Sequence, residues 1–175
     1  GSNQPKDISM DKRYESLCGI TQNELDYYFA ESMEEMAEVY HRDAEGMRQL
    51  LKGQYDGYHF GPRLVDVYNP FSLLNALDSM MIQDYWFRSG MPTYLIRLLN
   101  HTRENLDELT GRYYETPEFV DYKADVEKPL PMIYQSGYLT IKGYNMRRNT
   151  FLLDFPNNEV KNGFLTMVAS DYLKL

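Results

Sequence analysis

Asp56 is the acidic residue with the most defined local context in this sequence. It stands between Tyr55 and Gly57. Asp-Gly pairs favour turns, because the short carboxylate can accept backbone amides two residues on. A second interpretation is that Asp56 pairs with a basic group from another part of the protein. In the segment Tyr58-His59-Phe60 that follows, we expect the two aromatic rings to pack on one side and His59 to face the other.

Few residues are spaced for catalysis or for metal binding. His41, His59 and His101 are scattered, with no cysteine or carboxylate at ligand spacing. No arrangement of Ser, Cys and His indicates nucleophilic catalysis. Asp154 and Glu159 could be mistaken for the metal-binding carboxylates of a nuclease. That chemistry needs a carboxylate and a lysine that converge on a metal from adjacent strands, and we do not find the later strands expected for it in this sequence. We therefore predict no catalytic residue and no metal site.

A basic segment at residues 143–149 is the candidate for nucleic-acid binding. It contains Arg147, Arg148 and an aromatic residue, as the wing of a winged-helix protein does. A solvated turn explains the same pattern equally well. The formal net charge of -8 argues against a surface that binds a phosphate backbone over its whole area, and it leaves room only for a local basic patch.

The aromatic run at residues 85–87 has a large capacity for burial. Trp86, at its centre, is expected either to anchor a core between helices or to form an interaction hot spot, since Trp and Tyr are enriched in both settings.

Helical signals dominate the first half of the chain. Thr21-Gln22-Asn23-Glu24 is a capping box, which predicts a helix start. The inward face of this helix is expected to contain Leu25, Tyr28, Phe29, Met36, Val39 and Tyr40. A second helix, about Asp43 to Lys52, is expected to stop at Gly53, because helices often end at a left-handed glycine.

A third helix is predicted from Asn69 as the cap and Pro70 as the first helical residue. Its core face is expected to contain Phe71, Leu74, Leu77 and Met81. Residues 58–68, before it, have the pattern of a short β-hairpin or extended loop. Further helices are predicted at about 92–100, 103–109, 117–122 and 131–136.

The last third contains the clearest β-hairpin, with strands at 138–142 and 150–155, followed by a helix that starts at 156–158. The sequence therefore predicts a mostly helical α+β fold with one or two small β-hairpins. We divide the chain into a tag-derived start (1–5), a helical domain (6–125) and a connector with the hairpin and the last helix (126–175), because the charged segment 123–129 has the composition of a linker.

Composition is that of a soluble globular domain, and Cys18, the single cysteine, cannot form an internal disulfide. We find no signal peptide and no apolar stretch of about 20 residues, so we expect a cytoplasmic protein without membrane contact.

Five motifs in order resemble one known family. They are residues 17–21 (LCGIT), 55–60 (YDGYHF), 68–72 (YNPFS), 85–86 (YW) and 135–139 (QSGYL). In this order they resemble the bacterial AAA-ATPase-like proteins, many of which carry a C-terminal PD-(D/E)XK nuclease domain. The resemblance covers about residues 6–165. This sequence has no phosphate-binding G-x-x-x-x-G-K-[ST] loop, so it resembles the region after the nucleotide-binding core.

The resemblance implies a lid and connector that couples nucleotide state to a downstream nuclease and has no catalytic activity by itself. ATP and Mg²⁺ are implied for the longer protein only, and the implied partners are its own ATPase core and nuclease domain and, through the longer protein, nucleic acid. In such a lid an arginine can contact the nucleotide, since guanidinium pairs bidentately with phosphate oxygens. Arg63 is the first candidate, with Arg88 and Arg97 as rivals. The basic partner of Asp56 would then belong to the ATPase core or its nucleotide.

Two alternatives come from other classes of protein. One is a helical protein-interaction module with Trp86 and the tyrosines as its contact surface, and the motif residues Tyr55, Tyr58, Tyr68 and Asn69 would belong to that surface or to the core. The other is a winged-helix-like DNA-binding module that uses Arg147 and Arg148.

Overall fold

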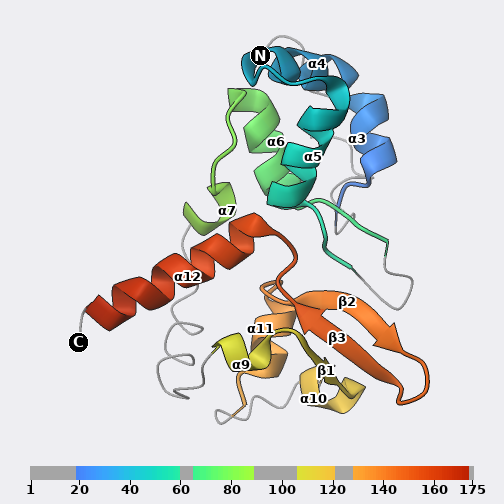
Figure 1. Cartoon of the computed structure of the whole chain (residues 1–175), viewed down its shortest axis with the longest axis vertical. Coiled ribbons are helices and arrows are strands. Elements are labelled where there is room, and N and C mark those ends of the chain that lie inside the picture. The colour runs from blue at the N-terminus through green and yellow to red at the C-terminus, as the bar shows by residue number, and fades with distance from the viewer. Residues whose placement is uncertain (1–18, 60–64, 89–105, 121–127, 174–175) are drawn as a thin grey trace.

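The structure is a computed structural model that describes residues 19–59, 65–88, 106–120 and 128–173. In these ranges the chain is mostly helical and contains a three-stranded antiparallel sheet, so the predicted mostly helical α+β class is confirmed. Two hydrophobic cores organise it. Helices surround the first core, the sheet belongs to the second, and α12 (Asn158–Leu173) passes between the two groups of elements (Figure 1).

The first group of elements is helical. Its members are α3 (Gln22–Tyr28), α4 (Ala30–Val39), α5 (Ala44–Tyr55), α6 (Pro70–Ser79) and the short α7 (Tyr85–Arg88). They bury a core of aliphatic, methionine and aromatic side chains, among them Leu25, Met36, Met47, Leu51, Tyr55, Tyr68, Leu73 and Leu77. Burial of this apolar surface is the main force that holds the helices together.

The capping box at the start of α3 is confirmed. The Glu24 amide donates to the Thr21 hydroxyl (3.2 Å), and the Thr21 amide donates to the Glu24 carboxylate (3.0 Å). The prediction of one helix through Tyr40 is wrong, because Phe29 leaves helical geometry and separates α3 from α4. The break shifts the helical phase, and Val39, predicted to face inward, is 54% exposed.

Helix α5 continues past its predicted end. Gly53 lies inside the helix, which ends only at Tyr55, where Asp56 turns to an extended conformation. Tertiary packing explains the difference, since Leu51 and Tyr55 are both fully buried and the last turn is therefore retained.

Helix α6 begins as predicted, and its core face differs from the prediction. The Asn69 side chain accepts the amide of Ser72, and Pro70 is in the first turn. Phe71 and Met81 are about half exposed, at 50% and 51%. Leu77 is buried as predicted, and the other buried residues are Ser72, Leu73 and Ala76. The actual core face is therefore rotated relative to the predicted one.

The second group contains the sheet. Strands β1 (Arg112–Tyr114), β2 (Thr140–Asn145) and β3 (Thr150–Asp154) have the order β1-β3-β2, and both pairings are antiparallel. Helices α9 (Leu106–Leu109), α10 (Thr116–Val120) and α11 (Leu130–Gln135) lie on the same side of α12 as the sheet (Figure 1). The second core includes Phe119, Ile133, Tyr138, Leu153, Val160 and Phe164. The predicted β2–β3 hairpin and final helix are confirmed.

Strand β1 was not predicted. It is three residues long, its side chains are mostly exposed, and it becomes a strand by pairing with β3. The sheet therefore contains residues from both predicted domains, 6–125 and 126–175. Of the predicted linker, residues 123–127 lie outside the described residues, as do the predicted helix at 92–100 and residues 103–105 of the next one.

In place of the expected hairpin at 58–68, the described residues of this segment form isolated β-bridges. Tyr58 pairs with Val67, and Tyr68 pairs with Ile20. These bridges hold both ends of the segment next to the helices. None of the described helices has the length and apolar character that a membrane crossing requires.

Candidate functional site

The Tyr55–Tyr58 segment connects the two cores. The Tyr55 ring is fully buried in the first core, and its hydroxyl donates to the Gln83 carbonyl (2.6 Å). The Tyr58 ring is buried in the second core. Asp56 and Gly57 therefore span the boundary. We call the contacts between Asp56–Gly57, Lys142 of β2 and Pro156–Asn157 before α12 the junction.

Gly57 is required at the junction by its backbone conformation and by its neighbours. Its φ is +93°, a region that other residues rarely adopt. A β-carbon at this position would lie 2.1 Å from the Pro156 carbonyl oxygen and 2.6 Å from Lys142 Nζ. No side chain fits between the two segments.

Lys142 holds these segments together. Its ammonium donates to the Gly57 carbonyl and to the Pro156 carbonyl, each at 2.9 Å. Burial lowers the pKa of Lys142, and the nearby carboxylates of Asp66, Asp56 and Asp154 oppose that shift.

Asn157 joins the same turn to α12. Its side-chain amide donates to the Asp56 carbonyl (2.9 Å), and its side-chain oxygen accepts the amide of Val160 (3.1 Å). The Asn157 side chain thus caps α12 and also binds the backbone of the Tyr55–Tyr58 segment, which we call the YDGY segment.

Glu159 connects α12 to two helices of the first group. This fully buried carboxylate accepts the Ser72 hydroxyl of α6 (2.7 Å) and the Trp86 amide of α7 (3.1 Å). Burial raises the pKa of Glu159 to about 7, because the charged form loses its hydration, and the two hydrogen bonds only partly oppose this.

His59 attaches the segment after Gly57 to β2. Its amide donates to the Thr140 hydroxyl (2.8 Å), which in turn donates to the His59 carbonyl (3.1 Å). The two ring nitrogens contact the Ile141 carbonyl and the Asp66 carboxylate. The ring therefore lies between β2 and Asp66. His59 is 6% exposed, and Phe60 lies outside the described residues, so the expected alternation of His59 with the two aromatic rings stays a prediction.

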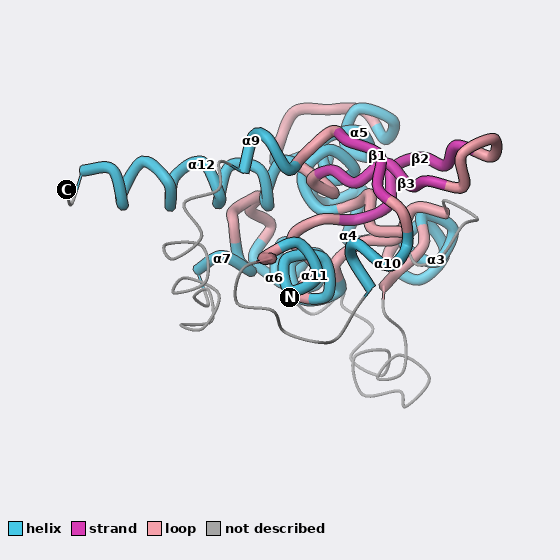
Figure 2. The backbone as a smooth tube through the Cα atoms, turned by 90° about the horizontal axis from the view of Figure 1, so that it is seen from below, coloured by secondary structure: helices cyan, strands magenta, loops and turns pink. Residues whose placement is uncertain are grey.

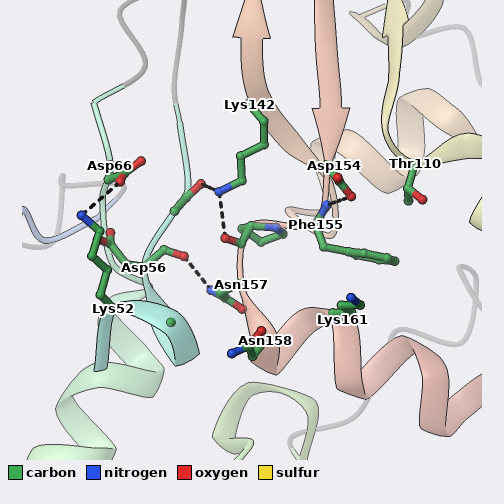
Figure 3. Close-up of a pocket in the computed structure, with 13 residues that line it drawn as sticks. Lys52, Asp56, Asp66, Thr110, Lys142, Asp154, Phe155, Asn157, Asn158 and Lys161 are labelled. Atoms are coloured by element: carbon green, nitrogen blue, oxygen red, sulfur yellow. Dashed lines mark hydrogen bonds and ion pairs between the residues drawn. The ribbon is translucent and has the colours of Figure 1, made fainter. Parts of the chain in front are cut away.

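A polar pocket of about 600 Å³ lies beside the junction, between the sheet, the end of α5 and the start of α12 (Figure 3). Charged residues of both signs line it. They are Lys52, Lys142, Lys161, Asp56, Asp66 and Asp154. We call this cavity the junction pocket.

Asp56 is the unusual member of this lining. Its side chain is 1% exposed, and neither carboxylate oxygen has a hydrogen-bond partner among the described residues. Burial raises the pKa of Asp56, and the nearby Gly57 amide and the Lys52 and Lys142 ammonium groups oppose that shift. The predicted turn at Asp56-Gly57 agrees with the positive φ of Gly57, and Lys142 also holds this turn through the Gly57 carbonyl.

Tyr68 and Trp86 are structural residues in this fold. Tyr68 is fully buried in the first core, and its hydroxyl donates to the Gln22 side chain (2.7 Å). Trp86 packs against the second core, with its ring stacked on Tyr138 at a centroid distance of 4.7 Å. This packing agrees with the interpretation of Trp86 as a core anchor, and its role as an interaction hot spot stays a prediction.

Of the predicted arginines, the structure describes the side chains of Arg147 and Arg148. Arg147 and Arg148 are exposed at the β2–β3 turn, where their amides donate to the Asn145 side chain. Arg63 and Arg97 lie outside the described residues, and only the backbone of Arg88, in α7, is described. Their proposed contact with nucleotide stays a prediction.

Sequence reasoning missed the residues that build the junction. Lys142, Asn157 and Ser72 contact positions that are 85, 101 and 87 residues away in the sequence. One local signal was present, since Asn157 is followed by a helix and asparagine is a favoured cap. The described residues contain no group of three or more His, Cys, Asp or Glu side chains that could hold a metal ion.

Comparison with known proteins gives one informative relative. It is a protein of Azotobacter chroococcum mcd 1 described as "Uncharacterized protein in vnfD 5'region", which is 32% identical over 181 residues. The match covers 99% of this chain and 32% of the relative, so the chain spans about a third of the length of that protein. No family model matches the chain. No solved structure matches it either.

Proposed function

We propose that this chain is the lid and connector of an AAA-ATPase-like protein, and that it transmits the nucleotide state of an ATPase core to a downstream nuclease domain. The observation that carries the proposal is the position of the YDGY segment. Tyr55 and Tyr58 lie in different cores, and Lys142 and Asn157 bind the backbone between them. A movement of the helical group would therefore act directly on β2 and α12.

The relative supports a role as part of a larger protein, because the chain matches only a third of its length. In this proposal the chain itself has no ATPase or nuclease activity, and ATP and Mg²⁺ bind to the ATPase core. The longer protein would act in the cytoplasm, with its own core and nuclease domain as partners and nucleic acid as the target of the nuclease.

One experiment tests the nucleotide part of the proposal. Arg63, Arg88 and Arg97 are replaced by Gln together in the longer protein. Nucleotide affinity, measured with a fluorescent ATP analogue, and ATP turnover are both expected to fall, because guanidinium groups pair with phosphate oxygens. If both quantities are unchanged, the chain does not contact the nucleotide.

A second experiment tests the connector part. Lys142→Met removes the contact between β2 and the YDGY segment, and Lys161→Met is the matched control on the exposed rim of the same pocket. We expect Lys142→Met to retain nucleotide binding and to lose the dependence of DNA cleavage on nucleotide. Equal nucleotide dependence in both variants would contradict a role in coupling.

A DNA-binding module is the second candidate, and the exposed turn between β2 and β3 favours it. Arg147 and Arg148 are exposed there beside Met146, which is 83% exposed, and the hairpin projects from the body of the molecule (Figure 2). Salt-sensitive binding of duplex DNA by this chain, weakened when both arginines are changed to Ala, would support this candidate.

A further inference from the structure

Asp56 differs from the other two aspartates that line the junction pocket. Asp66 contacts His59 and lies 3.7 Å from the Lys52 ammonium. The Asp154 carboxylate accepts the amide of Phe155 (2.8 Å). Both oxygens of Asp56 are buried and accept no hydrogen bond from the described residues. The buried side chain of this pocket that lacks a partner among the described residues is therefore a carboxyl group.

A buried carboxylate without a donor is costly, and native proteins seldom contain one. Such a residue needs an explanation, and a bound water, ion or ligand that supplies the donor is one. Asp56 lines a cavity of about 600 Å³, large enough to admit an organic group. Figure 3 shows that its side chain points toward Lys52 and Asp66, at one end of this cavity.

The lining indicates the chemical class of the ligand. Three lysines and three aspartates line the pocket, so the position of Asp56 decides the sign of the ligand. An anion bound at Asp56 would meet a buried carboxylate, and like charges repel strongly where water is scarce. Lys142, the most buried lysine of the pocket, already donates to two carbonyls. A planar cation with several N–H donors fits better, because guanidinium binds a carboxylate with two parallel hydrogen bonds.

We propose that the junction pocket binds a guanidinium group, held by the Asp56 carboxylate, and that an arginine side chain of another polypeptide segment supplies it. The ligand would neutralise Asp56 and would bridge the last turn of α5 to the sheet. This site is independent of the proposed role in nucleotide coupling, because it requires neither a nucleotide nor a second domain.

Lys52 controls access in this arrangement. Its side chain is about half exposed, and its contact with Asp66 is long, at 3.7 Å. Lys52 lies at the same end of the pocket as Asp56 (Figure 3), so an entering guanidinium would compete with the Lys52 ammonium for the carboxylates there. Lys52→Met removes this competitor and leaves the carboxylates in place, so it should tighten binding.

The test uses NMR titration of this chain with N-acetyl-arginine methylamide at neutral pH and low salt. We expect saturable shifts of the amides around the pocket, chiefly Gly57 and Asn158. The citrulline analogue, which has the same shape without the charge, should not bind. Asp56→Asn should weaken binding about tenfold or more, because it removes the charge from a hydrogen-bonded ion pair.

Two further variants make the test specific. Lys52→Met should bind the arginine probe several-fold more tightly than the native chain. Asp154→Asn, the matched control in the same pocket, should bind less than about threefold more weakly, because Asp154 already has a donor. Titration with free arginine identifies the source of the guanidinium group. Tighter binding of the capped probe indicates a polypeptide ligand. Tighter binding of free arginine indicates a small molecule and overturns the polypeptide source.

Three results would overturn the proposal. One is equal binding of the arginine and citrulline probes, and another is pyrophosphate binding that shifts the same amides. The third is an absence of shifts in both the native chain and Lys52→Met. If Asp56→Asn fails to fold, the citrulline comparison and Lys52→Met still decide between these outcomes.

Discussion

The Lys142 ammonium donates a 2.9 Å hydrogen bond to the carbonyl of Gly57, a residue that precedes it by 85 positions in the sequence. This contact attaches β2 to the backbone of the Tyr55–Tyr58 segment, which connects the two cores. Because the same ammonium also binds the Pro156 carbonyl, it fixes three chain segments at one point.

Gly57→Ala is predicted to destabilise the chain by at least about 2 kcal/mol, because of a positive φ and a β-carbon that would clash with the Pro156 carbonyl. Gly53→Ala is the matched control. Gly53 lies inside α5, and its nearest new contact would be an ordinary 3.5 Å, so this change is expected to stabilise by roughly 0.5–1 kcal/mol. Urea unfolding followed by circular dichroism measures both, and an equal effect of the two substitutions would contradict the geometry of the junction.

Lys142→Met is predicted to cost about 2 kcal/mol of unfolding free energy, because two carbonyls at the junction lose their donor. Lys161→Met, on the exposed face of α12, should stay within about 0.5 kcal/mol of the native chain. The measurement is the midpoint of chemical unfolding at constant pH. A native-like midpoint for Lys142→Met would show that the carbonyls find other partners.

Stability is predicted to fall as the pH rises from about 4.5 to about 7, through the titration of Glu159. The pKa of Glu159 is raised from 4.5 to about 7 in the folded chain, so in this window the folded state binds a proton that the unfolded state has released. Protonated Glu159 stabilises the fold fully below the pKa that it has in the unfolded chain. This stabilisation is lost as the pH rises through the pKa that Glu159 has in the folded chain, and it totals at most about 3 kcal/mol.

Glu159→Gln should remove this part of the pH dependence, since its amide can still donate to the Ser72 hydroxyl and accept the Trp86 amide. Glu118→Gln, an exposed control, should retain the native slope. Unfolding free energies at several pH values between 4.5 and 7.5 give the comparison, and identical slopes for all three proteins would disprove the assignment to Glu159.

Asn69→Ala is predicted to cost about 1 kcal/mol, because the Ser72 amide at the start of α6 loses its side-chain acceptor. Asn69→Ser should recover most of this loss, since serine is also a favoured cap. Thermal unfolding of the three proteins tests the role of the cap. No difference between the Ala and Ser variants would mean that packing alone fixes the start of α6.

Local signals in the sequence determined where several elements begin. The capping box at Thr21, the Asn69-Pro70 start of α6 and the β2–β3 hairpin follow from hydrogen bonds and dihedral preferences within a few residues. The composition and these signals together were sufficient for the mostly helical α+β class.

Tertiary packing decided the rest. Gly53 stays helical because Tyr55 beyond it is buried, β1 exists because β3 offers it a partner, and the inward face of α6 includes Leu73 rather than Phe71. The junction depends on Lys142, Asn157 and Glu159, and their contacts join residues that are far apart in the sequence. Such contacts form only when distant segments pack together. Local sequence patterns report on neighbours within a few residues, so they do not indicate which distant residues will meet.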